Sequence, residues 1–65
     1  MRDEILAYFR IIPAASADMV ASELGLDPRE TQNTLIEMDD DGLLLMRNGW
    51  YRLSEAAKKS GDGET

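Results

Sequence analysis

The sequence predicts a small α+β domain that is mostly helical, with a three-helix bundle followed by a two-stranded β-hairpin. Three observations lead to this prediction. Apolar residues recur at helical spacing in three successive stretches within residues 3–41. Glycine or proline stands at the boundaries of these stretches, where helices begin and end. Near the end of the chain, Asn48-Gly49 separates two apolar runs, and this pair is the strongest short signal for a type I′ hairpin turn.

The first helix is expected over residues 3–12. Pro13 ends it, because proline lacks the backbone N–H that a helix interior needs. Tyr8 lies off the apolar stripe, and we expect it at a half-exposed edge. Residues 14–16 are expected to form a short link that contributes one residue pair of a strand. The core face consists of apolar residues that fall on one side of the helix: Ile5, Leu6, Phe9 and Ile12.

The second helix is expected over residues 17–24. Ser16 is a favourable N-cap, and Gly25 closes the helix. Its core face is formed by Ala17, Val20, Ala21 and Leu24. A turn of about three residues that contains glycine then leads into the next helix, which is the helix-turn-helix arrangement.

The third helix is expected over residues 28–41. Asp27 serves as its N-cap, Pro28 occupies the first helical position, and Gly42 takes the left-handed conformation that ends it. Three residues at spacings of four and three share the core face: Thr31, Leu35 and Met38.

The hairpin is expected over residues 44–53, because the Asn48-Gly49 turn fixes the pairing of its strands. The register joins Arg47 with Trp50, Met46 with Tyr51, Leu45 with Arg52, and Leu44 with Leu53. Side chains alternate across a sheet. The expected core face therefore consists of Leu44, Met46, Tyr51 and Leu53, and the outer face of Leu45, Arg47, Trp50 and Arg52.

A last helical turn is expected over residues 55–59, capped by Ser54. Residues 60–65 are polar, contain two glycines and have no apolar residue, so we expect a disordered tail. The chain is thus interpreted as one domain over residues 1–59 and a polar tail over 60–65.

The spacing of these residues resembles the winged helix-turn-helix domains of bacterial and archaeal regulators. Ser16-Ala17-x-x-Val20-Ala21-x-x-Leu24-Gly25-Leu26 is similar to the second helix and turn of that family. Thr31-x-x-x-Leu35-x-x-Met38-x-x-x-Gly42-Leu43-Leu44 is similar to its recognition helix and first wing strand, and Trp50-Tyr51-Arg52-Leu53-Ser54 to its wing exit. The opening of the chain is similar to that of single-domain regulators of pilus operons and of small phage or plasmid regulators. The resemblance implies a transcriptional regulator that binds double-stranded DNA.

The recognition helix of that family enters the major groove by its N-terminal residues. Here the outward residues at this end are Arg29, Gln32, Asn33 and Ile36. Gln and Asn can read adenine, and Arg can read guanine or hold a phosphate. The alternative is that the polar residues serve only solubility.

The hairpin adds Arg47 and Arg52 on its outer face, where family members contact the DNA backbone or minor groove. Trp50 lies beside Arg47, where a cation–π contact can form. The alternative is a charged outer face that protects an edge strand from aggregation.

The charge balance favours a second interpretation. The net charge is −6, with 13 acidic and 7 basic residues, whereas DNA-binding domains normally carry a basic surface. Between residues 27 and 41, Arg29 is accompanied by six acidic residues: Asp27, Glu30, Glu37, Asp39, Asp40 and Asp41. The alternative is therefore a protein-interaction module that does not bind DNA directly. Its contact surface is either the acidic helix, with Ile36 and Asp40, or the outer hairpin face, with Leu45 and Trp50. An acidic surface of this kind can also mimic DNA and occupy a basic partner. A DNA-binding form is expected to act as a homodimer or beside a larger protein partner.

Composition argues against other classes of function. The chain has no cysteine and no histidine, so the usual zinc ligands and catalytic nucleophile pairs are missing. Glu37-x-Asp39-x-Asp41-Gly42 resembles the start of a calcium loop, but its twelfth position is Asn48 in place of Glu. We expect no enzyme activity, metal or cofactor. The longest apolar run, residues 43–46, is too short to span a membrane, and the first residues do not resemble a signal peptide, so a cytoplasmic protein is expected.

Overall fold

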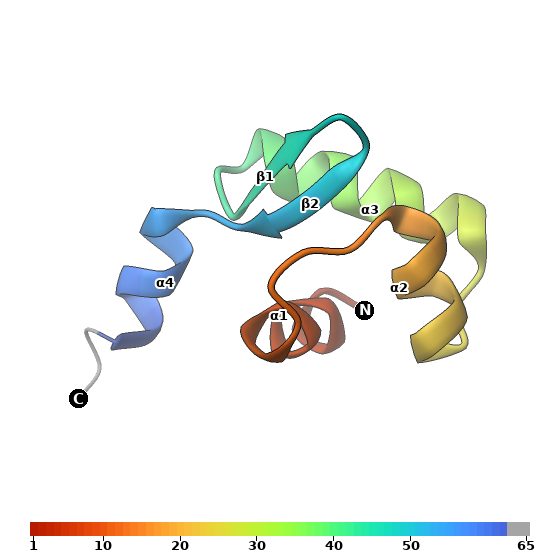
Figure 1. The fold of residues 1–65 in the computed structure, drawn as a ribbon, viewed down its shortest axis with the longest axis horizontal. Coiled ribbons are helices and arrows are strands. Elements are labelled where there is room, and N and C mark those ends of the chain that lie inside the picture. The colour runs from red at the N-terminus through yellow and green to blue at the C-terminus, as the bar shows by residue number, and fades with distance from the viewer. Residues whose placement is uncertain (63–65) are drawn as a thin grey trace.

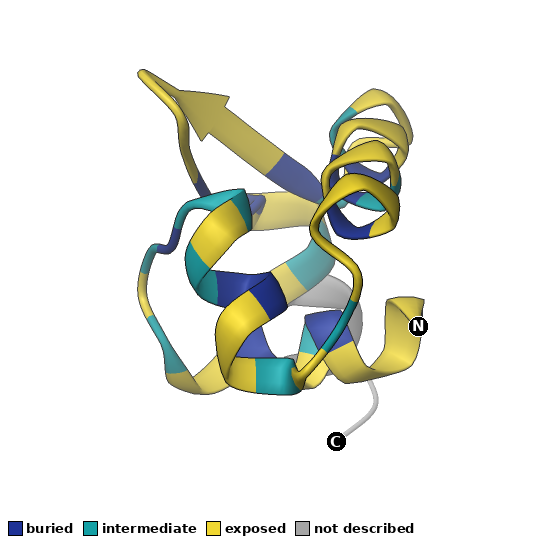
Figure 2. Cartoon of the chain, turned by 90° about the vertical axis from the view of Figure 1, so that its right-hand side faces the viewer, coloured by how far each residue is buried: buried dark blue, intermediate teal, exposed yellow. Residues whose placement is uncertain are grey.

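The computed structural model describes residues 1–62 as a small α+β fold that is mostly helical, with an antiparallel hairpin after the third helix. α3 and the hairpin lie on one side of the molecule, and α1 lies on the opposite side (Figures 1 and 2). None of the described helices is long and apolar enough to cross a membrane. The elements in chain order are α1 (Arg2–Ile11), α2 (Ala17–Leu24), α3 (Pro28–Asp40), β1 (Leu44–Arg47), β2 (Trp50–Leu53) and α4 (Glu55–Asp62).

Helix α1 buries Ile5 and Phe9 as predicted, whereas Leu6 and Ile12 are only partly buried and the buried face is shifted toward Tyr8. Tyr8 is only 8% exposed, so the prediction of a half-exposed edge was wrong. Its ring packs edge-on against Phe9, with 5.3 Å between the ring centroids. The helix ends at Ile11, and Ile12 adopts an extended conformation and is only partly buried. The buried stripe therefore runs through Ile5, Tyr8 and Phe9.

The caps of α2 and α3 are confirmed. The Ser16 hydroxyl accepts a hydrogen bond from the backbone N–H of Met19 at 3.3 Å, and the Asp27 carboxylate accepts one from the N–H of Glu30 at 3.0 Å. Each bond satisfies a backbone donor that the first turn of a helix leaves unpaired. Gly25 ends α2 with φ of 68°. Helix α3 ends at Asp40, one residue earlier than predicted, and Asp41 is its C-cap.

The hairpin has the predicted register at all four pairs, from Leu44 with Leu53 to Arg47 with Trp50. Asn48 and Gly49 have φ of 53° and 84°, and two successive positive φ values are what a type I′ turn requires. The strand pair expected in the first link is also present. Ala15 bridges to Tyr51, which adds a third, single-residue partner alongside β2.

Met46 departs from the predicted core face, because its side chain is 49% exposed. By strand alternation it points to the same side as Leu44, but it stands nearer the tip of the hairpin, beyond the edge of the core. Its partner Tyr51 is only 5% exposed and belongs to the core cluster.

The core is a single cluster to which the helices and both strands contribute. The predicted core residues of α3, Thr31, Leu35 and Met38, are fully buried. Leu44 and Ile5 are also fully buried, so α1, α3 and β1 meet at one point of the cluster. The rest of the cluster is Tyr8, Phe9, Ala15, Val20, Tyr51 and Leu53.

Ser54 connects three parts of the fold. Its hydroxyl donates to the carbonyl of Gly42 at 2.6 Å and accepts from the N–H of Ala57 at 3.1 Å. It therefore joins the end of α3 to the start of α4, directly after the hairpin. Helix α4 continues to Asp62, past the predicted end at residue 59 and into the segment 60–65 expected as a tail. Residues 63–65 lie outside the described residues.

We predict that Ser54→Ala lowers the free energy of unfolding by about 1–2 kcal/mol, because it removes a helix cap and leaves the part-buried Gly42 carbonyl without this donor. Urea unfolding followed by circular dichroism measures the change. Ser22→Ala is the matched control, because Ser22 is an exposed serine within α2. Equal unfolding midpoints for the two variants would contradict the role assigned to Ser54.

Candidate functional site

The first two turns of α3 expose the side chains that the sequence predicts as DNA contacts. Arg29, Gln32 and Asn33 are all exposed. None of the three forms a side-chain hydrogen bond or ion pair with another residue in the range 1–62. Figure 2 shows α3 nearly end-on, with its exposed side turned away from the core. Their donors and acceptors are therefore available to a partner.

The second half of α3 has a different character on the same exposed stripe. Ile36 is 49% exposed, and Asp40 is exposed one turn further on. Residues 29, 33, 36 and 40 are spaced by four, three and four, so they follow one line along the helix. The stripe thus changes from hydrogen-bonding groups at its start to an apolar and acidic end.

Arg2 partly compensates the acidic end of α3. Its guanidinium lies 2.7 Å from the Asp41 carboxylate and 3.8 Å from that of Glu37. All three side chains are well exposed, so each pair contributes at most about 1 kcal/mol. Sequence reasoning missed this role for Arg2, because its partner Asp41 is 39 residues away and no local spacing signals the contact.

The outer face of the hairpin presents apolar and basic side chains in alternation. Leu45 stands across from Arg52, and Arg47 across from Trp50, so the two arginines lie on one diagonal and the two apolar residues on the other. Leu45 is 41% exposed and Trp50 is 50% exposed. No acidic residue occurs between Gly42 and Ser54.

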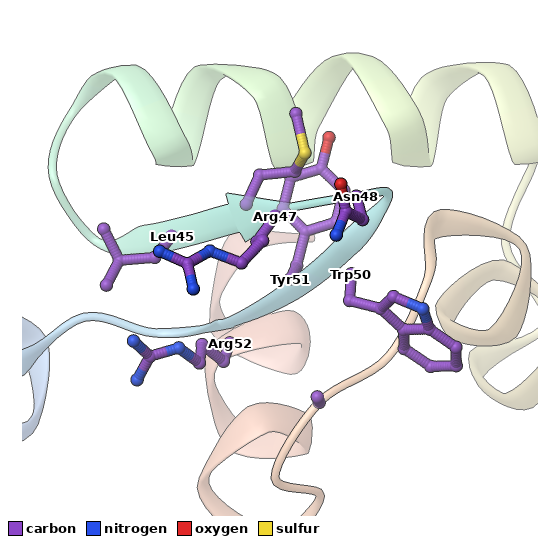
Figure 3. A pocket seen from close by; sticks show the side chains of 8 residues that line it. Leu45, Arg47, Asn48, Trp50, Tyr51 and Arg52 are labelled. Carbon is purple, nitrogen blue, oxygen red and sulfur yellow. The ribbon is translucent and has the colours of Figure 1, made fainter.

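These side chains border an open pocket of about 440 Å³ (Figure 3). No residue of α3 lines the pocket, and the labelled side chains of Leu45, Arg47 and Arg52 project from the side of the hairpin opposite α3. The Trp50 ring points away from the Arg47 guanidinium, so the two side chains do not form a cation–π contact. The residues that line the pocket are Ala14, Leu45, Met46, Arg47, Asn48, Trp50, Tyr51 and Arg52.

The structure therefore arranges the candidate residues in two groups. One group comprises Arg29, Gln32, Asn33, Ile36 and Asp40 on the exposed stripe of α3. The other comprises Leu45, Arg47, Trp50 and Arg52 on the outer hairpin face. The two groups point in different directions, because the labelled hairpin side chains project from the side of the hairpin opposite α3 (Figure 3).

The Tyr51 side chain is buried on the core face of the hairpin and remains a neutral phenol. Burial raises its pKa above the ordinary value near 10, and the negative charge of Asp39 on α3 raises it further. Tyr8 behaves in the same way, since burial and then Glu23 raise its pKa. Both phenols therefore stay protonated at neutral pH.

Comparison with known protein families, curated proteins and solved structures finds no match to this chain. Within the part of the chain that the structure describes, no three or more acidic side chains are grouped so that they could hold a metal ion.

We predict that raising the pH above about 10 destabilises the fold, with a smaller effect in Tyr51→Phe. The folded pKa of Tyr51 lies above its unfolded value, so the stability that its proton contributes is complete below pH 10 and is lost as the pH rises through the folded pKa. Urea unfolding midpoints measured from neutral to alkaline pH test this. Tyr8 accounts for the decline that remains in the variant, and equal slopes for the variant and wild type would contradict the assignment.

Proposed function

We propose that this protein is a small DNA-binding transcriptional regulator of the winged helix-turn-helix class. In this proposal α3 enters the major groove and the hairpin serves as the wing. The exposed start of α3 supports it most directly, since Arg29, Gln32 and Asn33 hold unused hydrogen-bonding groups there. Gln and Asn recognise adenine, and Arg recognises guanine, through paired hydrogen bonds. The proposed activity is binding, with no catalytic step.

Four of the six acidic side chains in residues 27–41 lie at the end of α3, in residues 37–41, whereas Asp27 and Glu30 stand beside Arg29 at its start. A helix rises 1.5 Å per residue, so Arg29 and Asp40 are about 16 Å apart along the axis. This exceeds the screening length of about 10 Å in 0.1 M salt. Repulsion between the acidic end of α3 and a phosphate at its start is therefore largely screened. Arg2 further reduces the acidic charge at that end.

The hairpin supplies few basic groups, so one copy makes few phosphate contacts. Neutralising two phosphates gives a salt dependence with a slope of only about −2 in logarithmic units. Weak binding by a single copy favours action as a homodimer or beside a larger protein, because two linked copies read paired half-sites.

We predict that Arg47→Ala combined with Arg52→Ala weakens duplex DNA binding uniformly across sequences and reduces the salt slope by about 2. Each arginine stands on the acid-free hairpin and contacts phosphate in the proposal. Fluorescence anisotropy with labelled duplexes at several salt concentrations measures both quantities.

The matched control is Arg10→Ala with Lys58→Ala, which removes the same charge from exposed residues of α1 and α4. An equal loss in the control would indicate a general charge effect. Wild-type binding no stronger than that of the hairpin variant would contradict DNA contact by this face.

We predict that Gln32→Ala and Asn33→Ala each remove about 1–3 kcal/mol of discrimination at one base pair and leave non-specific binding unchanged. A preferred site is first selected from random duplexes with the wild type, and each variant is then compared on that site and on a scrambled one. Glu30→Ala is the control, because Glu30 is also exposed near the start of α3. Unaltered discrimination in both variants would contradict base reading by α3.

The outer hairpin face favours a protein-interaction module as the second candidate. Leu45 and Trp50 are large apolar side chains half exposed to solvent, and the pocket between them is lined by no α3 residue. Stoichiometric recovery of one protein, without nucleic acid, by the immobilised chain would favour this candidate over DNA binding.

A further inference from the structure

The outer hairpin face is basic and apolar, whereas the exposed end of α3 is acidic and apolar, so the two surfaces are complementary. Arg47 and Arg52 lie on a diagonal of the two-stranded sheet, and diagonal neighbours are about 7–8 Å apart. Between them, Leu45 and Trp50 leave apolar surface exposed beside an open pocket. A ligand that fits this face carries an apolar group with acidic groups a few ångströms away.

The second half of α3 carries that combination. Ile36 is 49% exposed, Glu37 follows it, and Asp40 is one helical turn further on. Side chains three or four residues apart on a helix have Cβ atoms about 5–6 Å apart. Ile36 can therefore fill the space between Leu45 and Trp50 while Asp40, on the same line of the helix, meets one of the two arginines.

We propose that a second copy of this chain docks the end of its α3 on the outer hairpin face, so that copies associate head to tail. The occupant is inferred from charge. The hairpin carries no acidic residue between Gly42 and Ser54, whereas residues 37–41 hold four acidic side chains. The inference does not depend on DNA binding.

Geometry determines the form of this association. The inner face of the hairpin packs toward the core, so its outer face points away from α3 (Figure 3). One copy cannot bring its own helix end to its own hairpin face. In the head-to-tail arrangement, two copies leave one helix end and one hairpin face unused. Such a head-to-tail contact is heterologous and adds further copies.

Sedimentation equilibrium over a series of protein concentrations tests the proposal. The wild type is expected to rise above its monomer mass of 7.3 kDa as concentration increases, without levelling at twice that mass. A hairpin variant, Arg47→Glu with Arg52→Glu, and a helix variant, Ile36→Lys with Asp40→Lys, are each expected to stay at the monomer mass. Circular dichroism confirms that both variants are folded.

Mixing the two variants provides the decisive measurement. The helix variant keeps an intact hairpin face, and the hairpin variant keeps an intact α3. An equimolar mixture is therefore expected to form a complex of two chains and nothing larger, since each chain has one working face. With the helix variant labelled with ¹⁵N, amide shift changes are expected in residues 45–52 and not in α3.

The charge-matched control is Arg10→Glu with Lys58→Glu, which changes the net charge as the hairpin variant does and is expected to associate like the wild type. A wild type that remains at 7.3 kDa throughout the series would overturn the proposal. Association that both face variants retain, or a wild-type mass that levels at two copies, would also overturn it.

Discussion

The orientation of the hairpin depends on one backbone pairing between distant parts of the chain. The N–H of Ala15 donates to the carbonyl of Tyr51 at 3.0 Å, and the N–H of Tyr51 donates to the carbonyl of Ala15 at 2.8 Å. A two-stranded hairpin is marginally stable alone and needs packing against other elements. This pairing joins β2 to the link between α1 and α2, and it holds the Tyr51 ring against the core. The outer face of the hairpin is thereby turned to solvent.

Because the core is small, the stability of the fold depends on the contacts that join its helices and strands. A domain of this length buries only about 60% of its unfolded surface, so few contacts are redundant. Ile5, Leu35 and Leu44 come from α1, α3 and β1, and all are fully buried in one cluster. Ser54 adds a polar connection between the end of α3 and the start of α4. The exposed side chains of α3 and the hairpin are thus carried on elements whose opposite faces are fixed by packing.

The two proposals assign different partners to the same hairpin arginines. In DNA binding, Arg47 and Arg52 hold phosphates, and in self-association they face the acidic end of α3 of another copy. Both partners are exposed anions, so the two interactions exclude each other at this face. The start of α3, with Gln32 and Asn33, takes part only in DNA binding. If both proposals hold, DNA and head-to-tail association compete for the protein, and the acidic end of α3 acts as a substitute for phosphate.

The sequence by itself determined the order of the elements, the helix caps and the hairpin register. These features depend on local chemistry: Ser16 and Asp27 cap, Gly25 and Gly49 adopt positive φ, and strand alternation separates the two hairpin faces. Helical periodicity likewise predicted the exposure of Gln32 and Asn33. The burial of Tyr8 was also open to prediction, since it lies three residues after Ile5 on the same side of α1. Only the tertiary structure decided that Met46 extends past the core and that Arg2 pairs with Asp41. It also decided that the hairpin face points away from α3, because each of these outcomes depends on which distant segments pack together, and short-range spacing carries no information about that.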